Sequence, residues 1–527
     1  MNSISLARWG LIPLWLLLTL SVFFRTPTPI DETRYLTVAW EMWLRQDFLV
    51  PYLNGATYSH KPPLLFWLIN LSWGMFGVSE WAARMVGPFC ALLNLYMTRM
   101  LAKQLWPDEP KVALLAPWVL MATLLWTLFA TGTMFDILLS NCVLLGVLGL
   151  VWAKQGKEVL GWASFALAIG LGVLAKGPVI LVHLMPIALL LPVWRQKNSA
   201  VNYYRWYGFI FLALLVGALI ALAWAIPAAV QGGEAYAKAI LWSQTADRTM
   251  TTRIHARPFW WYLPFIPLFL FPWVAWPRFW QSLRPLPWKN DQGVCLSLLW
   301  LASGVLIFSL IQSKQVHYLV PLLPAFGLLM TRLLVSNERP RKLFSELVLP
   351  LCFCAIGVFL MLMPSMALFA KLAWVQGMDY VWGGSVLLIG LVLLGLTGWQ
   401  RQLSVFAVSA SVVLAIFIGF ICFFKYTGLA YDLQPAADQV KSFQEHAIPV
   451  AYLHNYQGQF HFLGRLTQPI EVVPNTQVLT WAEAHPNGYL ISVESEPDSS
   501  AHYMQRQRER WLIFRSAEQL LAQHSVK

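Results

Sequence analysis

Charged residues lie directly beside long apolar runs in this chain, at positions where membrane proteins place charge mainly for function. The apolar run from Trp9 to Phe24 is followed by Asp31-Glu32-Thr33-Arg34-Tyr35, and the motif Tyr58-Ser59-His60-Lys61-Pro62 precedes the next run. A carboxylate can act as a general base, whereas Arg and Lys bind phosphate groups. The two motifs therefore predict chemistry on a phosphate-bearing substrate.

Further polar residues are predicted on the same side of the membrane. Asp136 lies near the start of an apolar run, Lys176 lies in the turn before Gly177-Pro178, and later loops contain His255 with Arg257 and Lys314 with Tyr318. Short outer loops normally contain few basic residues. A lipid-borne phosphate would explain why these loops are basic.

Each of these residues also has a purely structural interpretation. Asp31 can cap a helix, Lys61 can extend towards lipid head groups, and Lys176 can simply belong to a turn. His183, inside an apolar run, is predicted to be packed. The histidines near the C-terminus are predicted to be surface residues: His446, His454 and His461.

Composition indicates a polytopic membrane protein. The 527 residues are 58% hydrophobic and 12% charged, and the 28 Trp are typical of the aromatic belts at membrane interfaces. The net charge of +12 does not indicate nucleic-acid binding, because the basic residues are spread over short loops. All six cysteines lie in apolar segments and predict neither a disulfide nor a metal site.

Apolar runs of about 17–25 residues predict approximately thirteen transmembrane helices. They lie near 9–24, 79–105, 112–130, 134–153, 159–175, 178–194, 206–229, 260–277, 293–312, 316–334, 343–363, 380–399 and 403–424. With the N-terminus inside, every inner loop is basic, as the positive-inside rule requires. The first loop, residues 25–78, is then outside, with two helices lying in the interface.

The composition changes after Tyr426. Residues 427–527 are polar, with short β-rich runs (449–453, 470–473, 489–493 and 511–514) between helical patterns at 436–446 and 478–484. The sequence thus predicts a membrane domain over residues 1–426 and a small outer α/β domain over residues 427–527.

The motifs resemble those of the GT-C glycosyltransferases that use polyprenyl-phosphate sugars, and within them the lipid A aminoarabinose transferases. The resemblance rests on the two first-loop motifs, Ala175-Lys176-Gly177, His255-Ala-Arg257-Pro-Phe-Trp-Trp-Tyr262 and Lys314-x-x-His-Tyr318. It implies a mainly α-helical GT-C membrane fold with interfacial helices and a small soluble domain. Protein O-mannosyltransferases share the acidic motif and less of the rest.

The resemblance also implies roles for individual residues. Asp31 matches the catalytic carboxylate and Asp136 a second functional aspartate, although the residues before Asp136 are spaced differently here. The carrier phosphate is expected at Arg34, Tyr58, Lys61, Arg257 and Tyr318, with Lys176 and Lys314 as further candidates. A divalent metal, Zn²⁺ or similar, is a candidate cofactor with His60 and His255 as ligands.

The implied function is transfer of a sugar from undecaprenyl phosphate to lipid A or another periplasmic acceptor, at the outer face of a bacterial inner membrane. The sugar 4-amino-4-deoxy-L-arabinose is one candidate. Alternatives are a protein O-glycosyltransferase and a non-catalytic flippase or transporter of lipid phosphates. A transporter should place ionisable residues at mid-membrane and show repeated halves, and the sequence shows neither.

Overall fold

The computed structural model describes residues 9–195, 201–243, 256–283, 291–336, 343–369, 372–400 and 404–525. Its contacts group the chain into two compact units that are not linear segments. The first unit contains the described residues of Met1–Val22, His60–Leu65 and Arg84–Phe420. The second contains those of Phe23–Ser59, Phe66–Ala83 and Ile421–Lys527, so most of the first loop is grouped with the C-terminal region.

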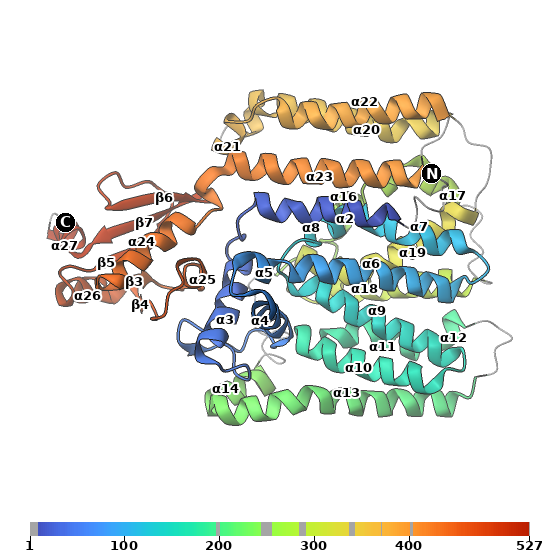
Figure 1. The fold of residues 1–527 in the computed structure, drawn as a ribbon, viewed down its shortest axis with the longest axis horizontal. Coiled ribbons are helices and arrows are strands. Elements are labelled where there is room, and N and C mark those ends of the chain that lie inside the picture. The colour runs from blue at the N-terminus through green and yellow to red at the C-terminus, as the bar shows by residue number, and fades with distance from the viewer. Residues whose placement is uncertain are drawn as a thin grey trace. The chain divides into compact units, whose positions relative to one another are not determined.

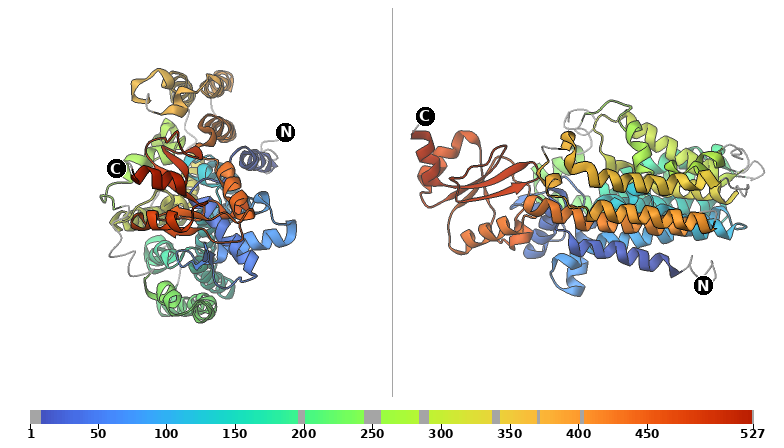
Figure 2. Two further views of the ribbon diagram at one scale, coloured as in Figure 1. Left: turned by 90° about the vertical axis from the view of Figure 1, so that its left-hand side faces the viewer. Right: turned by 90° about the horizontal axis from the view of Figure 1, so that it is seen from above.

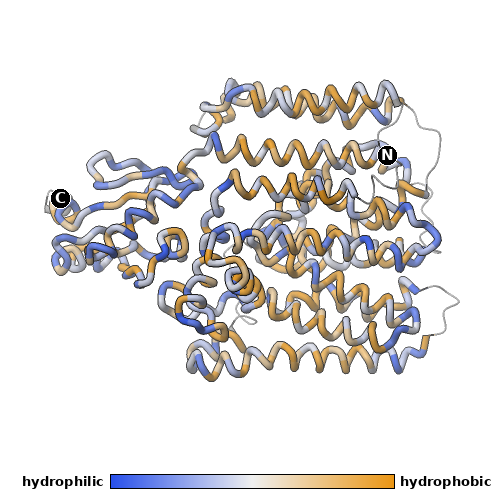
Figure 3. The backbone as a smooth tube through the Cα atoms, viewed as in Figure 1, coloured by the Kyte–Doolittle hydropathy of each residue, from blue (hydrophilic) through white to orange (hydrophobic). Residues whose placement is uncertain are grey.

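Long apolar helices make up most of the first unit, and they run alongside one another (Figures 1 and 2). Within the described ranges, nine are long and apolar enough to cross a membrane, and their apolar character is visible in Figure 3. The chain is therefore an integral membrane protein. The main helices are α2 (Leu11–Leu20), α6 (Val86–Leu105), α7 (Pro110–Met121), α8 (Leu124–Phe129), α9 (Phe135–Lys154), α10 (Glu158–Lys176), α11 (Val179–Leu189), α13 (Tyr203–Gly232), α18 (Gln292–Leu310), α19 (Leu323–Ser336), α20 (Leu343–Leu362), α22 (Val381–Gln400) and α23 (Val405–Thr427).

Most predicted spans coincide with these helices. The spans 112–130 and 178–194 are each divided into two helices, α7 with α8 and α11 with α12 (Leu191–Trp194), and the span 260–277 is wrong as a continuous helix. Residues 260–277 form only short pieces: η3 (Leu263–Phe265), α16 (Ile266–Phe269) and η4 (Trp273–Ala275). Pro264, Pro267 and Pro272 interrupt the segment, because a proline lacks the backbone donor that a continuous helix needs.

Helices α9 and α10 form a closely packed antiparallel pair around the turn at Gly156. A Cβ atom on Gly161 would lie 2.4 Å from the backbone nitrogen of Ala153, so only glycine permits this approach. Asp136 precedes Gly156 by about 20 residues and Lys176 follows it by about 20, which at ~1.5 Å per residue brings both to the same end of the pair.

The second unit is built around α3 (Asp31–Arg45), the predicted interfacial helix, and is completed by the C-terminal segment. The Thr37 hydroxyl donates to the Gly458 carbonyl at 2.5 Å, and the Trp40 indole donates to the Leu466 carbonyl at 3.0 Å. Gly458 has a φ of +76°, and a Cβ there would lie 2.5 Å from Leu53. The backbone of the C-terminal segment therefore lies directly on α3.

A five-stranded sheet forms the core of the C-terminal region, in the order β4-β3-β5-β7-β6. The strands are β3 (Val450–Leu453), β4 (Glu471–Val473), β5 (Tyr489–Glu494), β6 (Tyr503–Gln507) and β7 (Arg510–Ser516). Strands β3, β4 and β5 are parallel, whereas β7 is antiparallel to β5 and β6. Strand β6 was not predicted, because the polar run Gln505-Arg506-Gln507 lacks the apolar pattern expected of a strand.

Helices cover both faces of this sheet. Tyr452 and Ile491 pack with α24 (Gln434–Glu445), whereas their neighbours Ala451 and Leu490 pack with α26 (Val478–Ala484) and α27 (Ala517–Ser525). Adjacent strand residues thus face opposite sides, as the pleat requires. The predicted α/β architecture is confirmed.

Candidate functional site

Asp136 and Lys176 form a buried ion pair at one end of the α9–α10 pair. Their side chains are 2% and 8% exposed, and the Lys176 Nζ lies 2.5 Å from the Asp136 carboxylate. Asp136 is in the first turn of α9 and Lys176 ends α10, so each charge also complements the dipole of its own helix. Asp136 thus fixes the position of the Lys176 ammonium group.

Other predicted phosphate ligands lie around this pair. The Lys176 Nζ is 5.0 Å from the centre of the Tyr318 ring, and the Lys61 Nζ is 5.6 Å from that of Phe135, the residue before Asp136. The Asp136 carboxylate also interacts electrostatically with Lys61 and His317. We call Lys61, Asp136, Lys176 and Tyr318 the cationic cluster, since two ammonium groups accompany one carboxylate.

Lys314 and Arg257 lie on two segments that pair with each other. The buried Lys314 ammonium donates to the carbonyl of Arg257 at 3.0 Å and to that of Ile311. The Tyr262 hydroxyl donates to the Gln315 carbonyl at 3.1 Å, again joining the two segments. Lys314 therefore holds backbone together, whereas the side chain of Arg257 is exposed.

Asp31 and Arg34 form a second group, at the N-terminal end of α3 in the second unit. The Arg34 guanidinium donates to the Asp31 carboxylate, whose side chain is 50% exposed. Burial opposes the charged form of Arg34, but Tyr58, Tyr35 and Asp31 outweigh it and raise the pKa of Arg34. Burial, followed by the charge of Asp31, raises the pKa of Tyr35. The Asp31 carboxylate thus lies beside a permanent cation and is open to solvent or substrate.

One expectation about the acidic motif is wrong. Helix α3 begins at Asp31 itself with Ile30 at the N-cap position and no side-chain cap bond, so Asp31 is not the cap. The neighbouring Glu32 has a structural role. Its buried carboxylate accepts two bonds from Arg25, at 2.5 and 3.1 Å, and one from the Thr28 backbone nitrogen at 2.8 Å.

Gln457 is a residue of this group that sequence reasoning missed. Its side-chain oxygen accepts a 2.9 Å hydrogen bond from the Arg34 guanidinium, and its backbone nitrogen donates to the Gln459 side chain at 2.8 Å. No local pattern identifies it, because the contact joins residues 423 positions apart. The C-terminal segment therefore helps to position Arg34 beside Asp31.

The predicted burial is confirmed for three histidines and wrong for one. His183 is buried as predicted, and His446 and His454 are exposed. His461 is 2% exposed, so the prediction of a surface position is wrong: its Nδ1 lies 2.8 Å from the Tyr456 hydroxyl within the core. None of the six cysteines, all of which the structure describes, is part of a disulfide bond.

The predicted pair of metal ligands cannot be compared with the structure, because only one of the two lies among the described residues. His60 is exposed and adjacent to Lys61, whose positive charge opposes a divalent cation, and His255 lies outside the described residues. In the described ranges, no group of three or more His, Cys, Asp or Glu side chains is arranged to hold a metal ion. We therefore derive no catalytic step through a metal.

Sequence comparisons agree with the resemblance seen in the motifs. The family model described as dolichyl-phosphate-mannose-protein mannosyltransferase matches residues 60–224. The undecaprenyl phosphate-alpha-4-amino-4-deoxy-L-arabinose arabinosyl transferase 1 of Pseudomonas fluorescens (strain Pf-5) is 28% identical over 424 residues, 76% of this chain and 74% of that protein. The corresponding transferase of Pectobacterium atrosepticum is 30% identical over 346 residues, 62% of this chain and 61% of that protein.

The fold matches solved structures of the same kind. The crystal structure of ArnT from Cupriavidus metallidurans bound to undecaprenyl phosphate has a TM-score of 0.75 and 18% identity, and the match covers 97% of each chain. The apo structure of that protein matches with the same TM-score, covering 97% of this chain and 98% of the other. The predicted GT-C fold is confirmed.

Proposed function

We propose that this chain, a GT-C glycosyltransferase related to the undecaprenyl phosphate-aminoarabinose transferases, transfers 4-amino-4-deoxy-L-arabinose from undecaprenyl phosphate to lipid A. The observation that carries the proposal is the cationic cluster, in which Asp136 holds the buried ammonium of Lys176 close to Tyr318. A prenyl-linked phosphate is a ligand that such a cluster, at the ends of apolar helices, can bind.

The cationic cluster is proposed to stabilise the leaving group. When the sugar departs, negative charge accumulates on the phosphate, and preorganised cations in a water-poor site stabilise that charge. Lys61 and Lys176 supply the cations, Tyr318 can donate a hydrogen bond, and the exposed Arg257 can add a further contact. Lys314 is a weaker candidate, because its ammonium already donates to two carbonyls.

Asp31 is the proposed catalytic carboxylate. It can deprotonate a hydroxyl acceptor as a general base, or support positive charge that develops at the anomeric carbon. If the acceptor is itself a phosphate, no base is needed and Asp31 orients the substrate. Arg34, which pairs with Asp31, and Tyr58, which interacts electrostatically with Arg34, are proposed to bind the donor. A single displacement inverts the anomeric centre.

The reaction is proposed to take place on the periplasmic face of a bacterial inner membrane. Support comes from the basic loops assigned to the inner side and from the polar C-terminal domain assigned to the outer side. A reporter that is active only after export, fused at Lys527, should be active. Activity of a cytoplasm-specific reporter at the same position would reverse the orientation.

A second candidate function is O-glycosylation of a protein acceptor, which the mannosyltransferase family match favours. Mass spectrometry of lipid A and of glycoproteins, from cells with and without this protein, separates the two. If lipid A loses aminoarabinose while the glycoproteins are unchanged, the first function is supported. If proteins lose glycan while lipid A is unchanged, the second is supported. If neither changes and lipid-phosphate transport is impaired, the chain is a flippase or scaffold.

A divalent metal held by His60 and His255 also remains a proposal. Transfer that is lost after chelation and restored by Zn²⁺ would support it. A His60→Ala variant with unchanged transfer and unchanged sensitivity to chelation would count against His60 as a ligand.

A further inference from the structure

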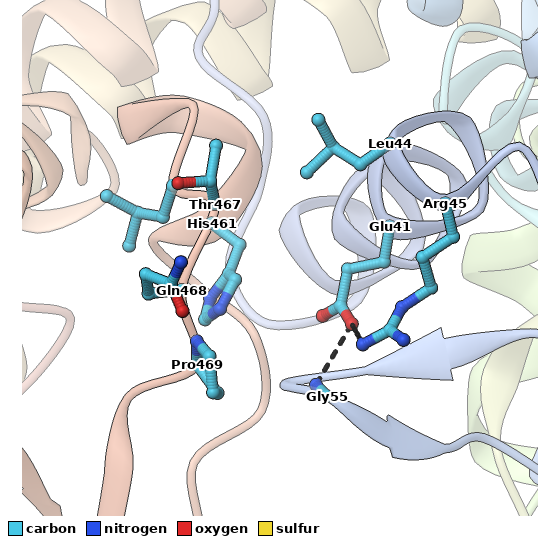
Figure 4. A pocket seen from close by; sticks show the side chains of 9 residues that line it. Glu41, Leu44, Arg45, Gly55, His461, Thr467, Gln468 and Pro469 are labelled. Carbon is cyan, nitrogen blue, oxygen red and sulfur yellow. Dashed lines mark hydrogen bonds and ion pairs between the residues drawn. The ribbon is translucent and has the colours of Figure 1, made fainter.

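A cavity of about 380 Å³ with both polar and apolar lining residues lies in the second unit beside the C-terminal half of α3 (Figure 4). Its volume falls in the lower part of the ~300–1,000 Å³ range of small-molecule sites. It is lined by Glu41, Leu44 and Arg45 from α3, Gly55 from the hairpin that follows α3, and His461, Leu466, Thr467, Gln468 and Pro469 from the C-terminal segment.

Hydrogen bonds hold the walls of this cavity in place. Asn54, at the tip of the hairpin formed by β1 (Tyr52–Leu53) and β2 (Ala56–Thr57), exchanges two 2.8 Å bonds with the backbone of Ile470. On the other side the Trp40 indole donates to the Leu466 carbonyl. A cavity with such walls is preformed, which reduces the cost of ordering a ligand.

Hydrogen-bonding groups of both kinds face the cavity, and carbon surfaces lie between them. The Glu41 carboxylate is buried and accepts from the backbone nitrogens of Gly55, at 2.9 Å, and Asn54. The Arg45 guanidinium lies 3.9 Å from that carboxylate. The His461 Nε2 is buried next to the Gln468 backbone without a well-formed hydrogen bond.

We propose that this cavity binds the uncharged, hydroxyl-bearing edge of a saccharide unit of the acceptor. Sugar hydroxyls both donate and accept, which suits Glu41, His461 and Gln468 together. The carboxylate of Glu41 beside Arg45 disfavours a phosphate, which Arg45 alone would attract. A prenyl chain is disfavoured because it would leave the buried Nε2 of His461 without a hydrogen-bond partner.

The cavity's position on α3 indicates which part of the acceptor it binds. Glu41 follows Asp31 by ten residues on one continuous helix, which corresponds to a separation of about 15 Å along the axis. A group bound there cannot be the reacting group at Asp31. This inference rests on the proposed function: the cavity holds a distal sugar of an elongated glycolipid acceptor and so affects acceptor binding rather than the chemical step.

Filling the cavity tests the proposal. Thr467 lines the cavity with an exposed side chain, so Thr467→Trp should block it without disturbing the core, and Thr476→Trp is the matched control at an exposed threonine outside it. With lipid A as acceptor, we expect Thr467→Trp to raise the acceptor KM about tenfold, a difference of about 1.4 kcal/mol. The donor KM, kcat and Tm should equal those of the control.

A shorter acceptor provides the second arm of the experiment. With the single-sugar acylated phosphate fragment of lipid A, the two variants should have equal KM values, because the distal sugar is missing. Equal KM values for intact lipid A, or a raised donor KM in Thr467→Trp, would overturn the proposal.

Direct binding separates this proposal from the proposed function. If wild-type protein transfers no aminoarabinose, the proposed function fails, and saturation-transfer NMR with the lipid-free disaccharide then decides about the cavity. Binding by wild type and Thr476→Trp that is lost in Thr467→Trp supports the site. Absence of binding to wild type overturns it.

Discussion

Exchanging each carboxylate of the acidic motif for its amide should separate catalysis from stability. Asp31→Asn keeps the size of the side chain but removes the charge that can accept a proton or support a carbocation. Asp31 is half exposed and pairs with Arg34 near the surface, where such pairs contribute only about 0–1 kcal/mol. We expect a folded protein with a near-normal Tm and transfer reduced by about 10²–10⁴-fold.

Glu32→Gln should behave in the opposite way. Both Glu32 and Arg25 have side chains only 4% exposed, and the amide removes the negative charge that faces the buried Arg25 guanidinium. Removing one partner of a buried pair costs about 3–5 kcal/mol. The variant should therefore unfold at a clearly lower temperature. The fraction that remains folded should transfer sugar at close to the wild-type rate.

The assay measures thermal unfolding and single-turnover transfer on the same detergent-purified samples. Arg25→Met with Glu32→Leu is the control for Glu32, because replacing both charges should recover part of the stability that Glu32→Gln loses. A stable but inactive Glu32→Gln, together with an active Asp31→Asn, would mean that the catalytic carboxylate has been assigned wrongly.

Four other predictions follow from the contacts. Lys61→Ala and Arg257→Ala should each weaken transfer, because each loses about 1.5–3 kcal/mol of phosphate binding. Lys314→Ala should mainly lower the Tm. Equal losses of Tm in all three variants would contradict the distinction between phosphate-binding and structural residues. Asp136→Asn should destabilise the protein by about 3–5 kcal/mol, because it leaves Lys176 unpaired. Adding Lys176→Met should restore stability but not transfer. Unfolding and activity measurements on the single and the double variant check this. Gln457→Ala should lower kcat several-fold at constant Tm, and Gln457→Glu should restore kcat because its carboxylate again accepts from Arg34. Gln477→Ala is the control at an exposed glutamine. A lower Tm without a change in kcat would mean that Gln457 has only a structural role. Burial lowers the pKa of His461 from its usual 6.5 to about 4, so protonation favours the unfolded state. The free energy of unfolding should therefore fall by on the order of 3 kcal/mol as the pH drops from about 6.5 to 4. A His461→Phe variant should show a flatter pH dependence of unfolding.

The membrane part was largely predictable because helix length and apolar composition are local properties. Two helices of matching length around the Gly156 turn are enough to bring Asp136 and Lys176 together, and the sequence prediction placed both on the same side. The segment 260–277 was mispredicted because hydropathy counts apolar residues but not the backbone donors that its prolines remove.

The acidic motif was only partly predictable, since the roles of its residues depend on distant partners. Adjacent helical residues point about 100° apart, so either Asp31 or Glu32 could have faced inwards. Arg25, seven residues before Glu32, decides the matter by pairing with it, and a sequence pattern cannot distinguish that arginine from one that faces lipid head groups. The surface prediction for His461 failed for the same reason, because its partner Tyr456 belongs to a core that the polar local sequence does not indicate.

The contacts between the C-terminal region and α3 indicate that this region contributes to the site at Asp31. Gln457 accepts from Arg34, and Gly458 contacts Thr37 through its carbonyl, one helical turn further along α3. The segment that orients the cation beside Asp31 is therefore continuous with the segment that lines the cavity at His461 and Thr467. A single stretch of about a dozen residues can thus affect both the geometry at the proposed catalytic carboxylate and the recognition of a distant part of the acceptor. This arrangement explains why the contacts group the first loop with residues after 421: the acidic motif needs the C-terminal segment to complete its own surroundings.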